Sequence, residues 1–242
     1  MIKNYHFTRI SSTNDYARQI IENESEVIVT ADHQTNGRGR KERQWQGDFG
    51  ANLFFTYAVN HKKIATFKNI LSFLTSTSLM VINTLREFAP KTEFIIKYPN
   101  DILARNDKDR FKKISGILTE HIFQGNIPLI SIIGIGVNIN QKEFPPYISS
   151  IACSLAQLGY NVNLSTFTNI LQDKFEGLYL QDEIELFEKW KSEINIKGKL
   201  VTRDGSNKIW KAEEILLDGR LLISSDTDKA IIDDGETIRY GM

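Results

Sequence analysis

The chain has 242 residues with 30 basic and 30 acidic side chains, so its net charge is zero and its pI is near 6.9. General nucleic-acid and membrane-surface binders usually carry a basic excess, and the balance argues against both classes. The single cysteine, Cys153, excludes an internal disulfide, and no apolar run has the length of a signal-peptide core or a membrane span. We therefore expect a cytoplasmic globular protein.

The first predicted elements are short and are separated by polar residues. Residues 5–10 predict a strand, and Val27–Ala31 and Asn52–Val59 predict two more from their β-branched and aromatic content. Between the first two strands, Ser12-Thr13-Asn14 precedes a helical pattern that runs to Ile21. These three residues either cap the helix and do nothing more, or present hydroxyl and N–H groups at the helix N-terminus to a polar ligand.

A long polar connection, residues 31–45, joins the second and third strands. It contains two glycines one residue apart and three arginines, Arg38, Arg40 and Arg43. Ordered connections of this length are uncommon inside a compact domain and are usually functional. Because glycines let backbone N–H groups close around phosphate and arginines bind carboxylate or phosphate in a bidentate manner, the loop predicts an anion site. The alternative is that these arginines lie on the surface and bind no ligand.

The middle of the chain predicts one long helix followed by strands. Apolar residues recur at helical spacing over residues 66–88, and Pro90 ends the pattern. The predicted strands are Phe94–Lys97, Ile102–Ala104, Lys113–Glu120 and Leu129–Asn140. Gly134 and Gly136 lie inside the last strand, where they mark either a close approach by a ligand or backbone, or a bulge or tight packing.

The last third predicts helices and then a β module. Ser150–Leu158 predicts a short helix that buries an inert Cys153, and residues 163–195 predict two helices with apolar stripes. The stripes are Phe167, Ile170, Leu171, Phe175 and Leu178, then Ile184, Phe187, Trp190 and Ile194. After residue 197, short apolar segments alternate with Asp-Gly pairs at 204–205, 218–219 and 234–235, a strong hairpin signal. We expect a domain at 1–195 and a β module at 196–242.

The polar clusters together indicate a reaction class. Lys97, Asn100, Asp101 and Lys113 lie at strand ends, as do the arginines of the long connection. Cations next to a carboxylate able to hold Mg²⁺ suit a reaction that joins two anions, such as a carboxylic acid and a nucleotide phosphate. The four histidines are scattered, and the sequence has no nucleophile elbow, Walker A loop or Rossmann fingerprint.

The order of these motifs resembles that of the biotin–protein ligases. The matching motifs are Ser12-Thr-Asn, Gln34-Thr-Asn-Gly-Arg-Gly-Arg with a downstream Trp45, Lys97-Tyr-Pro-Asn-Asp, Lys113-Ile-Ser-Gly-Ile-Leu-Thr-Glu and Gly134-Ile-Gly-Val-Asn. The resemblance runs from about residue 8 to about residue 160. It implies an α+β fold, in which a mixed sheet packs with helices as in class II synthetases, followed by a small SH3-like β-barrel.

The resemblance also implies a two-step reaction. The biotin carboxylate attacks the α-phosphate of ATP to give biotinyl-5′-AMP and pyrophosphate. The ε-amine of one lysine on a biotin carboxyl carrier protein, as in acetyl-CoA carboxylase, then attacks the mixed anhydride and releases AMP. The implied cosubstrates are biotin, ATP and Mg²⁺, with no tightly bound metal.

The family's functional positions carry over to this sequence as follows. Lys113 and Arg38 are the implied catalytic residues. The implied biotin-binding residues are Ser12, Thr13, Asn14, Gln34, Arg38, Gly39, Arg40, Lys113, Gly116, Gly134 and Gly136. The implied ATP-binding residues are Arg38, Arg40, Arg43, Trp45, Lys97, Asn100 and Asn138, with Asp101 toward Mg²⁺. We expect the loop at 31–45 to be mobile without ligand and to order over biotinyl-AMP.

The sequence departs from the family pattern in two places. Tyr98 stands where members commonly have Trp, a change from one aromatic side chain to another. The match begins within about ten residues of Met1, so we expect a monofunctional ligase without the DNA-binding domain that some bacterial members carry. Family members often pair through a sheet edge, so the resemblance also makes a homodimer possible.

Two rival functions remain. One is a lipoate ligase or octanoyltransferase of the same fold; the transferases use a cysteine as the acyl acceptor. The other is a non-catalytic biotin or nucleotide sensor.

Overall fold

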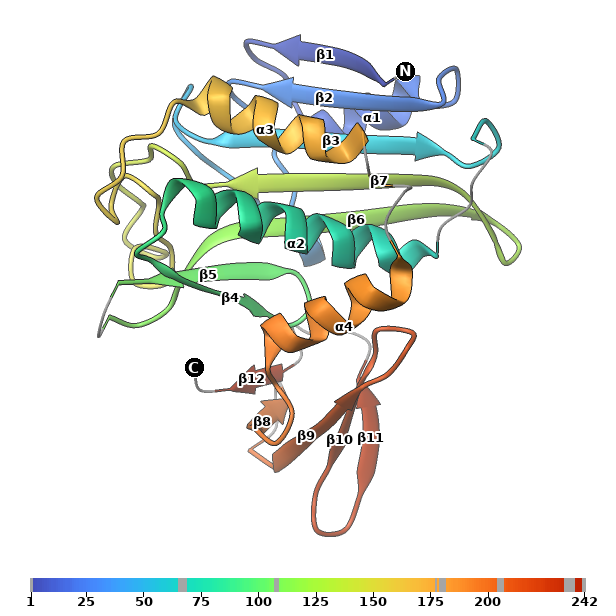
Figure 1. Ribbon diagram of the computed structural model, residues 1–242, viewed down its shortest axis with the longest axis vertical. Coiled ribbons are helices and arrows are strands. Elements are labelled where there is room, and N and C mark those ends of the chain that lie inside the picture. The colour runs from blue at the N-terminus through green and yellow to red at the C-terminus, as the bar shows by residue number, and fades with distance from the viewer. Residues whose placement is uncertain are drawn as a thin grey trace.

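A seven-stranded mixed sheet forms the larger part of the computed structural model (Figure 1), which describes residues 2–64, 69–106, 109–176, 178, 182–203, 207–232 and 238–240. The strand order is β1-β2-β3-β7-β6-β5-β4. Only β1 and β2 are parallel within this sheet; the other neighbours are antiparallel. The strands are β1 (Lys3–Phe7), β2 (Glu26–Ala31), β3 (Leu53–Asn60), β4 (Glu93–Lys97), β5 (Asp101–Arg105), β6 (Lys112–Gln124) and β7 (Ile127–Val137).

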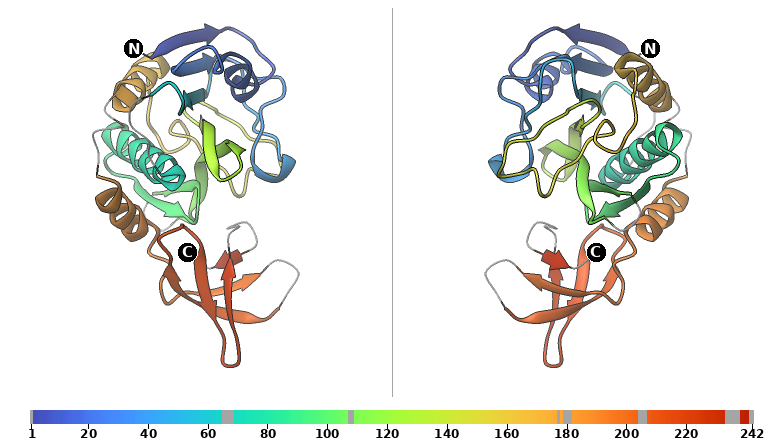
Figure 2. Two further views of the ribbon diagram at one scale, coloured as in Figure 1. Left: turned by 90° about the vertical axis from the view of Figure 1, so that its right-hand side faces the viewer. Right: turned by 90° about the vertical axis from the view of Figure 1, so that its left-hand side faces the viewer.

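Helices cover both faces of this sheet. Helices α2 (Ile70–Phe88) and α3 (Leu164–Glu176) lie on one face, with α4 (Glu183–Ile194) below α2, whereas α1 (Thr13–Ile20) lies on the other face (Figures 1 and 2). Ala17 and Ile21 at the end of α1 pack with Val27, Ala58 and Ile132 of the sheet. Within the described residues, no helix is long and apolar enough to cross a bilayer.

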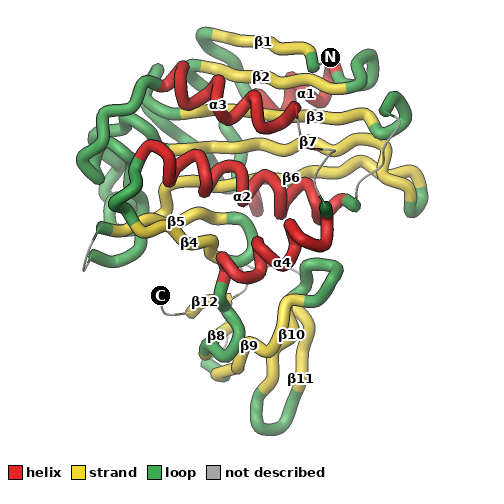
Figure 3. Tube along the Cα trace, viewed as in Figure 1, coloured by secondary structure: helices red, strands yellow, loops and turns green. Residues whose placement is uncertain are grey.

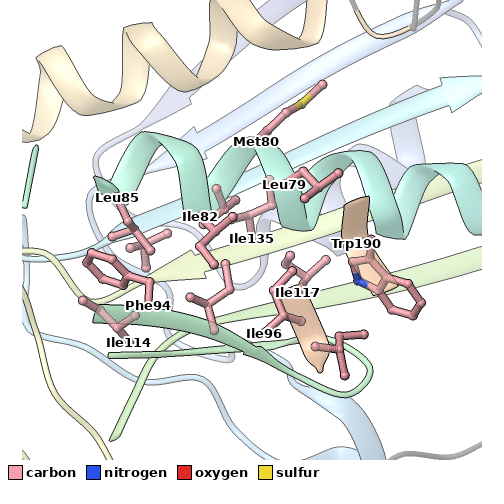
Figure 4. Close-up of a cluster of buried hydrophobic side chains, with 14 of the residues drawn as sticks. Leu79, Met80, Ile82, Leu85, Phe94, Ile96, Ile114, Ile117, Ile135 and Trp190 are labelled. Carbon is pink, nitrogen blue, oxygen red and sulfur yellow. The ribbon is translucent and has the colours of Figure 1, made fainter. Parts of the chain in front are cut away.

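The main hydrophobic core lies between α2 and the sheet. Leu79, Ile82 and Leu85 of α2 meet Phe94 and Ile117 of the strands (Figure 4). Side chains alternate between the two faces of a strand. Since Ile133, Ile135 and Val137 of β7 are buried in this core, the intervening Gly134 and Gly136 face the α1 side.

A second, smaller sheet follows α4 (Figure 3). Its strands are β8 (Leu200–Arg203), β9 (Ile209–Ile215), β10 (Leu221–Ser224), β11 (Lys229–Ile232) and β12 (Ile238–Tyr240), in the order β11-β10-β9-β8-β12. All its pairings are antiparallel. The predicted turn at 218–219 joins β9 to β10, with Gly219 at a φ of +85°. The predicted turns at 204–205 and 234–235 lie outside the described residues.

The expected fold class is confirmed: a mixed sheet with helices precedes a small antiparallel sheet. Where the first domain ends stays a prediction, because buried side chains form one continuous cluster from Phe55 and Ile135 in the large sheet through Trp190 to Val201 and Ile223 in the small one.

The predicted helix at Ser150–Leu158 is wrong. This segment is a series of turns, and Ala152 within it forms a parallel bridge with Lys113 of β6. The Lys113 N–H donates to the carbonyl oxygen of Ile151 (2.7 Å), and the Cys153 N–H donates to that of Lys113 (2.9 Å). A long-range partner therefore takes the backbone groups that a helix would have used. One smaller correction concerns Ile184, which was expected in the core but is 74% exposed in the first turn of α4.

Candidate functional site

A cavity of about 420 Å³ opens on the α1 side of the large sheet. Strands β6 and β7 form its floor, the start of α1 lies at one end, and the connection from β2 to β3 forms a wall. Every residue that the sequence singled out for chemistry lines it: Ser12, Thr13, Asn14, Gln34, Arg38, Gly39, Arg40, Arg43, Trp45, Lys97, Asn100, Asp101, Lys113, Gly116, Gly134, Gly136 and Asn138.

Glycines leave the floor of the cavity free of side chains. Gly116 of β6 lies directly opposite Gly136 of β7. A Cβ on Gly136 would lie 2.2 Å from the indole ring of Trp45, and a Cβ on Gly134 would lie 2.5 Å from Oδ1 of Asn14. Both distances are far inside van der Waals contact, so close approach of neighbouring side chains requires glycine at these two positions. The neighbours are side chains, so tight packing is the interpretation that the structure supports, and close approach by a ligand stays a prediction.

The start of α1 contributes a polar, neutral end to the cavity. Ser12 caps the helix by accepting from the N–H of Asp15 (3.3 Å), as the simpler interpretation predicted. Thr13 does more: its N–H and its hydroxyl both point to Oε1 of Gln34, at 2.7 and 3.0 Å. The buried hydroxyl of Thr56 on β3 donates to Oδ1 of Asn14 (2.6 Å), which fixes the orientation of that amide.

Glu120 of β6 joins this polar end to the arginine-bearing loop. Its carboxylate accepts from Nδ2 of Asn14 (2.9 Å), from Arg18 (2.9 Å) and from Arg38 (3.2 Å). Arg38 also forms an ion pair with Asp15, at 2.6 Å. The guanidinium of Arg38 therefore lies between two carboxylates at the edge of the cavity. From the sequence, Glu120 is only the last residue of a predicted strand, with no role assigned to it.

The opposite side of the cavity carries the lysine and the Asn-Asp turn. The ammonium of Lys113 lies 2.7 Å from Oδ1 of Asp101, and Arg40 donates to Oδ1 of Asn100 (2.9 Å). Lys113 also lies 5.3 Å from the ring centroid of Trp45, a cation–π distance. Side chains from three separate sequence motifs thus converge here, and two pairs of them are in direct contact: Lys113 with Asp101, and Arg40 with Asn100.

The connection from β2 to β3 folds back on itself over the cavity. Arg38 and Gln44 form an antiparallel bridge, the Gly39 N–H donates to the Arg43 carbonyl (2.6 Å), and the Trp45 N–H donates to the Gly37 carbonyl (2.9 Å). A Cβ on Gly37 would lie 2.3 Å from the backbone oxygen of Trp45. The glycines therefore permit a tight fold-back that brings the Trp45 ring onto the glycine floor.

An apolar wall completes the cavity, and the sequence did not predict it. It consists of side chains that come from the segment before β6 and from the irregular segment after β7: Phe111, Phe144, Ile148, Ile151 and Ala152. Of these residues, Ile151 and Ala152 lie in the segment for which a helix was expected, and Phe144 and Ile148 precede it. Its pairing with Lys113 brings its apolar side chains to the cavity, a long-range contact that local patterns do not encode.

The described residues contain no group of three or more His, Cys, Asp or Glu side chains placed to hold a metal ion. Asp101 is a carboxylate in the cavity, and Mg²⁺ is commonly held by one or two carboxylates together with substrate phosphates. Asp101 therefore fits a magnesium ion that arrives with a nucleotide and does not by itself form a resident metal site.

Cys153 lies near the cavity but has the properties of an inert thiol. It is 4% exposed, and its thiol lies 3.5 Å from the carbonyl oxygen of Lys112. Burial raises the pKa of the Cys153 thiol to about 12. The thiolate is the nucleophilic form of cysteine, so this side chain is unsuited to accept an acyl group.

The comparisons with known proteins agree with one another. The model of the Biotin/lipoate A/B protein ligase family matches residues 6–138. The bifunctional ligase/repressor BirA of Bacillus spizizenii is 34% identical over 152 residues, covering 61% of this chain and 44% of that protein. The biotin–[acetyl-CoA-carboxylase] ligase of Mycobacterium tuberculosis is 31% identical over 136 residues, covering 55% of this chain and 46% of that protein.

Among solved structures, the biotin protein ligase from Aquifex aeolicus in complex with biotin and ATP resembles this chain over its whole length. The TM-score is 0.76 and the identity 25%, and the match covers 99% of each chain. The matched region thus spans less than half the length of the two curated relatives, and nearly all of the structural one.

Proposed function

The chain belongs to the biotin/lipoate A/B protein ligase family, and from that premise we propose that it is a biotin–protein ligase. In this proposal it joins biotin to ATP as biotinyl-5′-AMP, and then transfers the biotinyl group to one lysine of a biotin carboxyl carrier protein. The cytoplasmic setting and pairing through a sheet edge stay predictions.

One observation carries the proposal: two cationic side chains from separate motifs flank a neutral pocket. Arg38 lies at the end where Thr13, Asn14 and Gln34 form the polar network, and Lys113 lies across the glycine floor. A compact, uncharged head group suits the polar end, while a carboxylate suits the cations. This arrangement would hold one molecule with both features and leave its carboxylate beside a second anion.

The cations address the main obstacle to the first step. In that step an oxygen of the substrate carboxylate forms a bond to the α-phosphorus of ATP, and the bond from that phosphorus to the bridging oxygen breaks to release pyrophosphate. Both reactants are anions, so they repel each other unless positive charge lies between them. Lys113 and Arg38 would supply that charge, which would also stabilise the negative charge that develops on the phosphoryl oxygens.

The second step needs the anhydride to survive until the carrier arrives. The lysine amine of the carrier forms a bond to the acyl carbon, the bond from that carbon to the AMP oxygen breaks, and the amine loses a proton. Trp45 and the folded-back loop at 37–45 would exclude water from the anhydride in the meantime. Asp101 and the nucleotide phosphates would hold Mg²⁺, which would neutralise phosphate charge.

The two rivals make different demands on the site. An octanoyltransferase of this fold needs a cysteine that accepts the acyl group, and the buried Cys153 thiol does not meet that need. A lipoate ligase would use the same cations and is separated from a biotin ligase by its substrate alone. A non-catalytic sensor has no need of an arginine on one side of the pocket and a lysine on the other.

The deciding experiment measures pyrophosphate release by the purified protein. The protein is mixed with Mg-ATP and, in separate reactions, with biotin, lipoate or octanoate. Pyrophosphate with biotin alone supports the proposal, and pyrophosphate with lipoate alone would identify a lipoate ligase. Failure to turn over biotin, even with a biotin carboxyl carrier domain added, would overturn it. Transfer is then followed as a mass increase on that domain.

A further inference from the structure

Tyr98 lies inside the Lys97–Asp101 motif, yet its contacts are with the small C-terminal sheet. It is 3% exposed and is not among the residues that line the cavity. Its backbone N–H donates to the hydroxyl of Tyr240 on β12 (3.0 Å), and its own hydroxyl donates to the carbonyl oxygen of Gly219 in the β9–β10 turn (2.7 Å). Its ring centroid is 6.3 Å from that of Trp190 on α4.

The turn that follows Tyr98 carries the polar groups that contact the cavity's cations. Oδ1 of Asn100 accepts from Arg40 (2.9 Å), while Nδ2 of the same amide donates to the carbonyl oxygen of Ile117 (2.7 Å). Asp101 is the ion-pair partner of Lys113 at 2.7 Å. A continuous path of direct contacts therefore leads from Tyr240 through the backbone of 98–101 to Arg40 and Lys113.

The two residues of the small sheet that bond to Tyr98, Gly219 and Tyr240, are themselves held in place. Gly219 has a φ of +85°, which favours glycine, and a Cβ there would lie 2.7 Å from Leu71 of α2, so the turn packs tightly on the main helix layer. Tyr240 is held on β12 by its pairing with Val201 of β8. Burial, with a smaller contribution from the Asp101 carboxylate, raises the pKa of the Tyr240 hydroxyl to about 12 although the hydrogen bond from the Tyr98 N–H lowers it, so the hydroxyl stays protonated. The small sheet therefore has a defined position against the turn.

The polar end of the cavity does not depend on these contacts. Thr13 of α1 bonds to Gln34 in the connection from β2 to β3, and Asn14 of α1 bonds to Thr56 of β3 and Glu120 of β6. A loosened 98–101 turn would thus disturb the Asn100 and Asp101 contacts and leave the polar end intact. This separation gives the C-terminal sheet a specific influence on one half of the site.

We propose that Tyr98 and Tyr240 are positioning residues through which the C-terminal sheet holds the Asn100–Asp101 turn against Arg40 and Lys113, and so sets how the nucleotide is bound and activated. The inference rests on the proposed function for the identity of the nucleotide as ATP. Removing the Tyr240 hydroxyl would leave the buried N–H of Tyr98 without its acceptor, and the turn would have to move to satisfy it.

The test uses the full chain with the substitutions Tyr240→Phe and Tyr98→Phe, each of which removes one hydroxyl and nothing else. We expect kcat/KM for ATP in biotin-dependent pyrophosphate release to fall at least tenfold, and the Kd for biotin without ATP to stay within twofold. Tyr160→Phe is the matched control, because the Tyr160 hydroxyl contacts Thr92 (3.3 Å) and neither residue lines the cavity.

Two results would overturn the proposal. One is unchanged ATP kinetics in both variants; the other is a parallel loss of ATP and biotin binding that follows thermal stability, as a merely structural role would give. Hydrogen exchange of the 97–102 amides supplies a readout independent of activity: faster exchange in Tyr240→Phe than in Tyr160→Phe is expected, and equal exchange would refute the contact's role. An inactive wild-type chain would refute the proposed function, and the exchange experiment would still decide whether the small sheet holds the turn.

Discussion

The ammonium of Lys113 on β6 lies 2.7 Å from the carboxylate of Asp101 on β5. The two residues come from different sequence motifs and meet because their strands are neighbours in the sheet. Both side chains are partly exposed, at 35% and 24%, so an ion pair of this kind contributes little to folding, about 1 kcal/mol or less. The pair therefore matters to the chemistry of the cavity more than to the stability of the fold.

Replacement of Lys113 by alanine tests this distinction. We expect Lys113→Ala to slow adenylate formation by about 10²–10³-fold, the usual effect of removing one charge-stabilising group from a site of this kind. The melting temperature should change by no more than about 4 °C. Lys112→Ala is the matched control, since Lys112 precedes it on β6 and contacts Ser149 outside the cavity. A folded Lys113→Ala protein with full activity would remove this lysine from the mechanism.

The glycine floor predicts a substitution that a second substitution can rescue. Gly136→Ala places a methyl group 2.2 Å from the Trp45 ring, so we expect at least a tenfold loss of biotin affinity by calorimetry. In a Trp45→Ala protein the clashing ring is gone. Gly136→Ala should therefore cost less biotin affinity in that background than it costs in the wild-type protein. If the double variant binds no better than additivity predicts, the clash with Trp45 is not the cause.

Gly134→Ala should behave differently. Its methyl group would meet the Asn14 amide at 2.5 Å, and that amide is held by both Thr56 and Glu120. Because this neighbour cannot move without breaking those bonds, no single truncation should rescue the variant without itself weakening ligand binding. Calorimetry of Gly134→Ala and of Gly134→Ala with Asn14→Ala checks this, and recovery of wild-type affinity in the double variant would contradict it.

The loop at 37–45 offers several trypsin sites, Arg38, Arg40, Lys41 and Arg43, so its closure can be followed by proteolysis. We expect cleavage within the loop to slow by about tenfold or more when biotin and Mg-ATP are present, because ordering over the adenylate removes the extended conformations that proteases need. Mass spectrometry of the fragments identifies the cleavage sites. Equal cleavage rates with and without biotinyl-AMP would count against a lid.

Two histidines away from the cavity predict a loss of stability in mild acid. His121 Nδ1 and His61 Nε2 each lie 2.8 Å from the buried hydroxyl of Ser131. Burial, followed by the neighbouring His61, lowers the pKa of His121 to about 4, while the nearby Glu120 carboxylate opposes this; burial also lowers the pKa of His61. The unfolded chain therefore binds more protons than the folded chain between about pH 4 and pH 6.5.

This imbalance means that the free energy of unfolding should fall as the pH drops from about 6.5 to 4, and should be flat above that range. One pKa unit corresponds to about 1.4 kcal/mol, and with allowance for the partial exposure of the ring we expect a loss of about 2 kcal/mol. Urea denaturation at pH 7, 6, 5 and 4.5 measures it. His121→Asn should flatten the slope, and an unchanged slope in that variant would assign the acid sensitivity to other groups.

Much of the site could be predicted because its residues occur in short motifs at strand ends. Asp101 and Lys113 lie at the starts of the neighbouring strands β5 and β6, and the motif of Arg38 lies in the connection between β2 and β3. Local patterns also identified the glycines of β7, although they left open whether close approach by a ligand or backbone, or a bulge or tight packing, explained them. The side chains of Asn14 and Trp45 pack against them, so tight packing accounts for both.

The parts of the site and fold that the sequence did not predict depend on pairings between segments that are distant in the sequence. Glu120 and Thr56 reach Asn14 only through the register of β6, β7 and β3, which no local pattern specifies. The segment at 150–158 is not helical because Lys113 takes its backbone groups. Ile184 has helical spacing but lies in the first turn of α4, where its side chain is exposed.

The burial of Cys153 gives the chain a practical property: in the folded state it behaves toward thiol reagents as a cysteine-free protein. We expect the wild-type protein to stay unlabelled by maleimide dyes for as long as it remains folded, and labelling that matches the denatured rate would contradict this. A single cysteine introduced at the exposed Lys41 would then be the one site that accepts a fluorophore. Its emission would follow the 37–45 loop in real time, without the replacement of any native residue elsewhere.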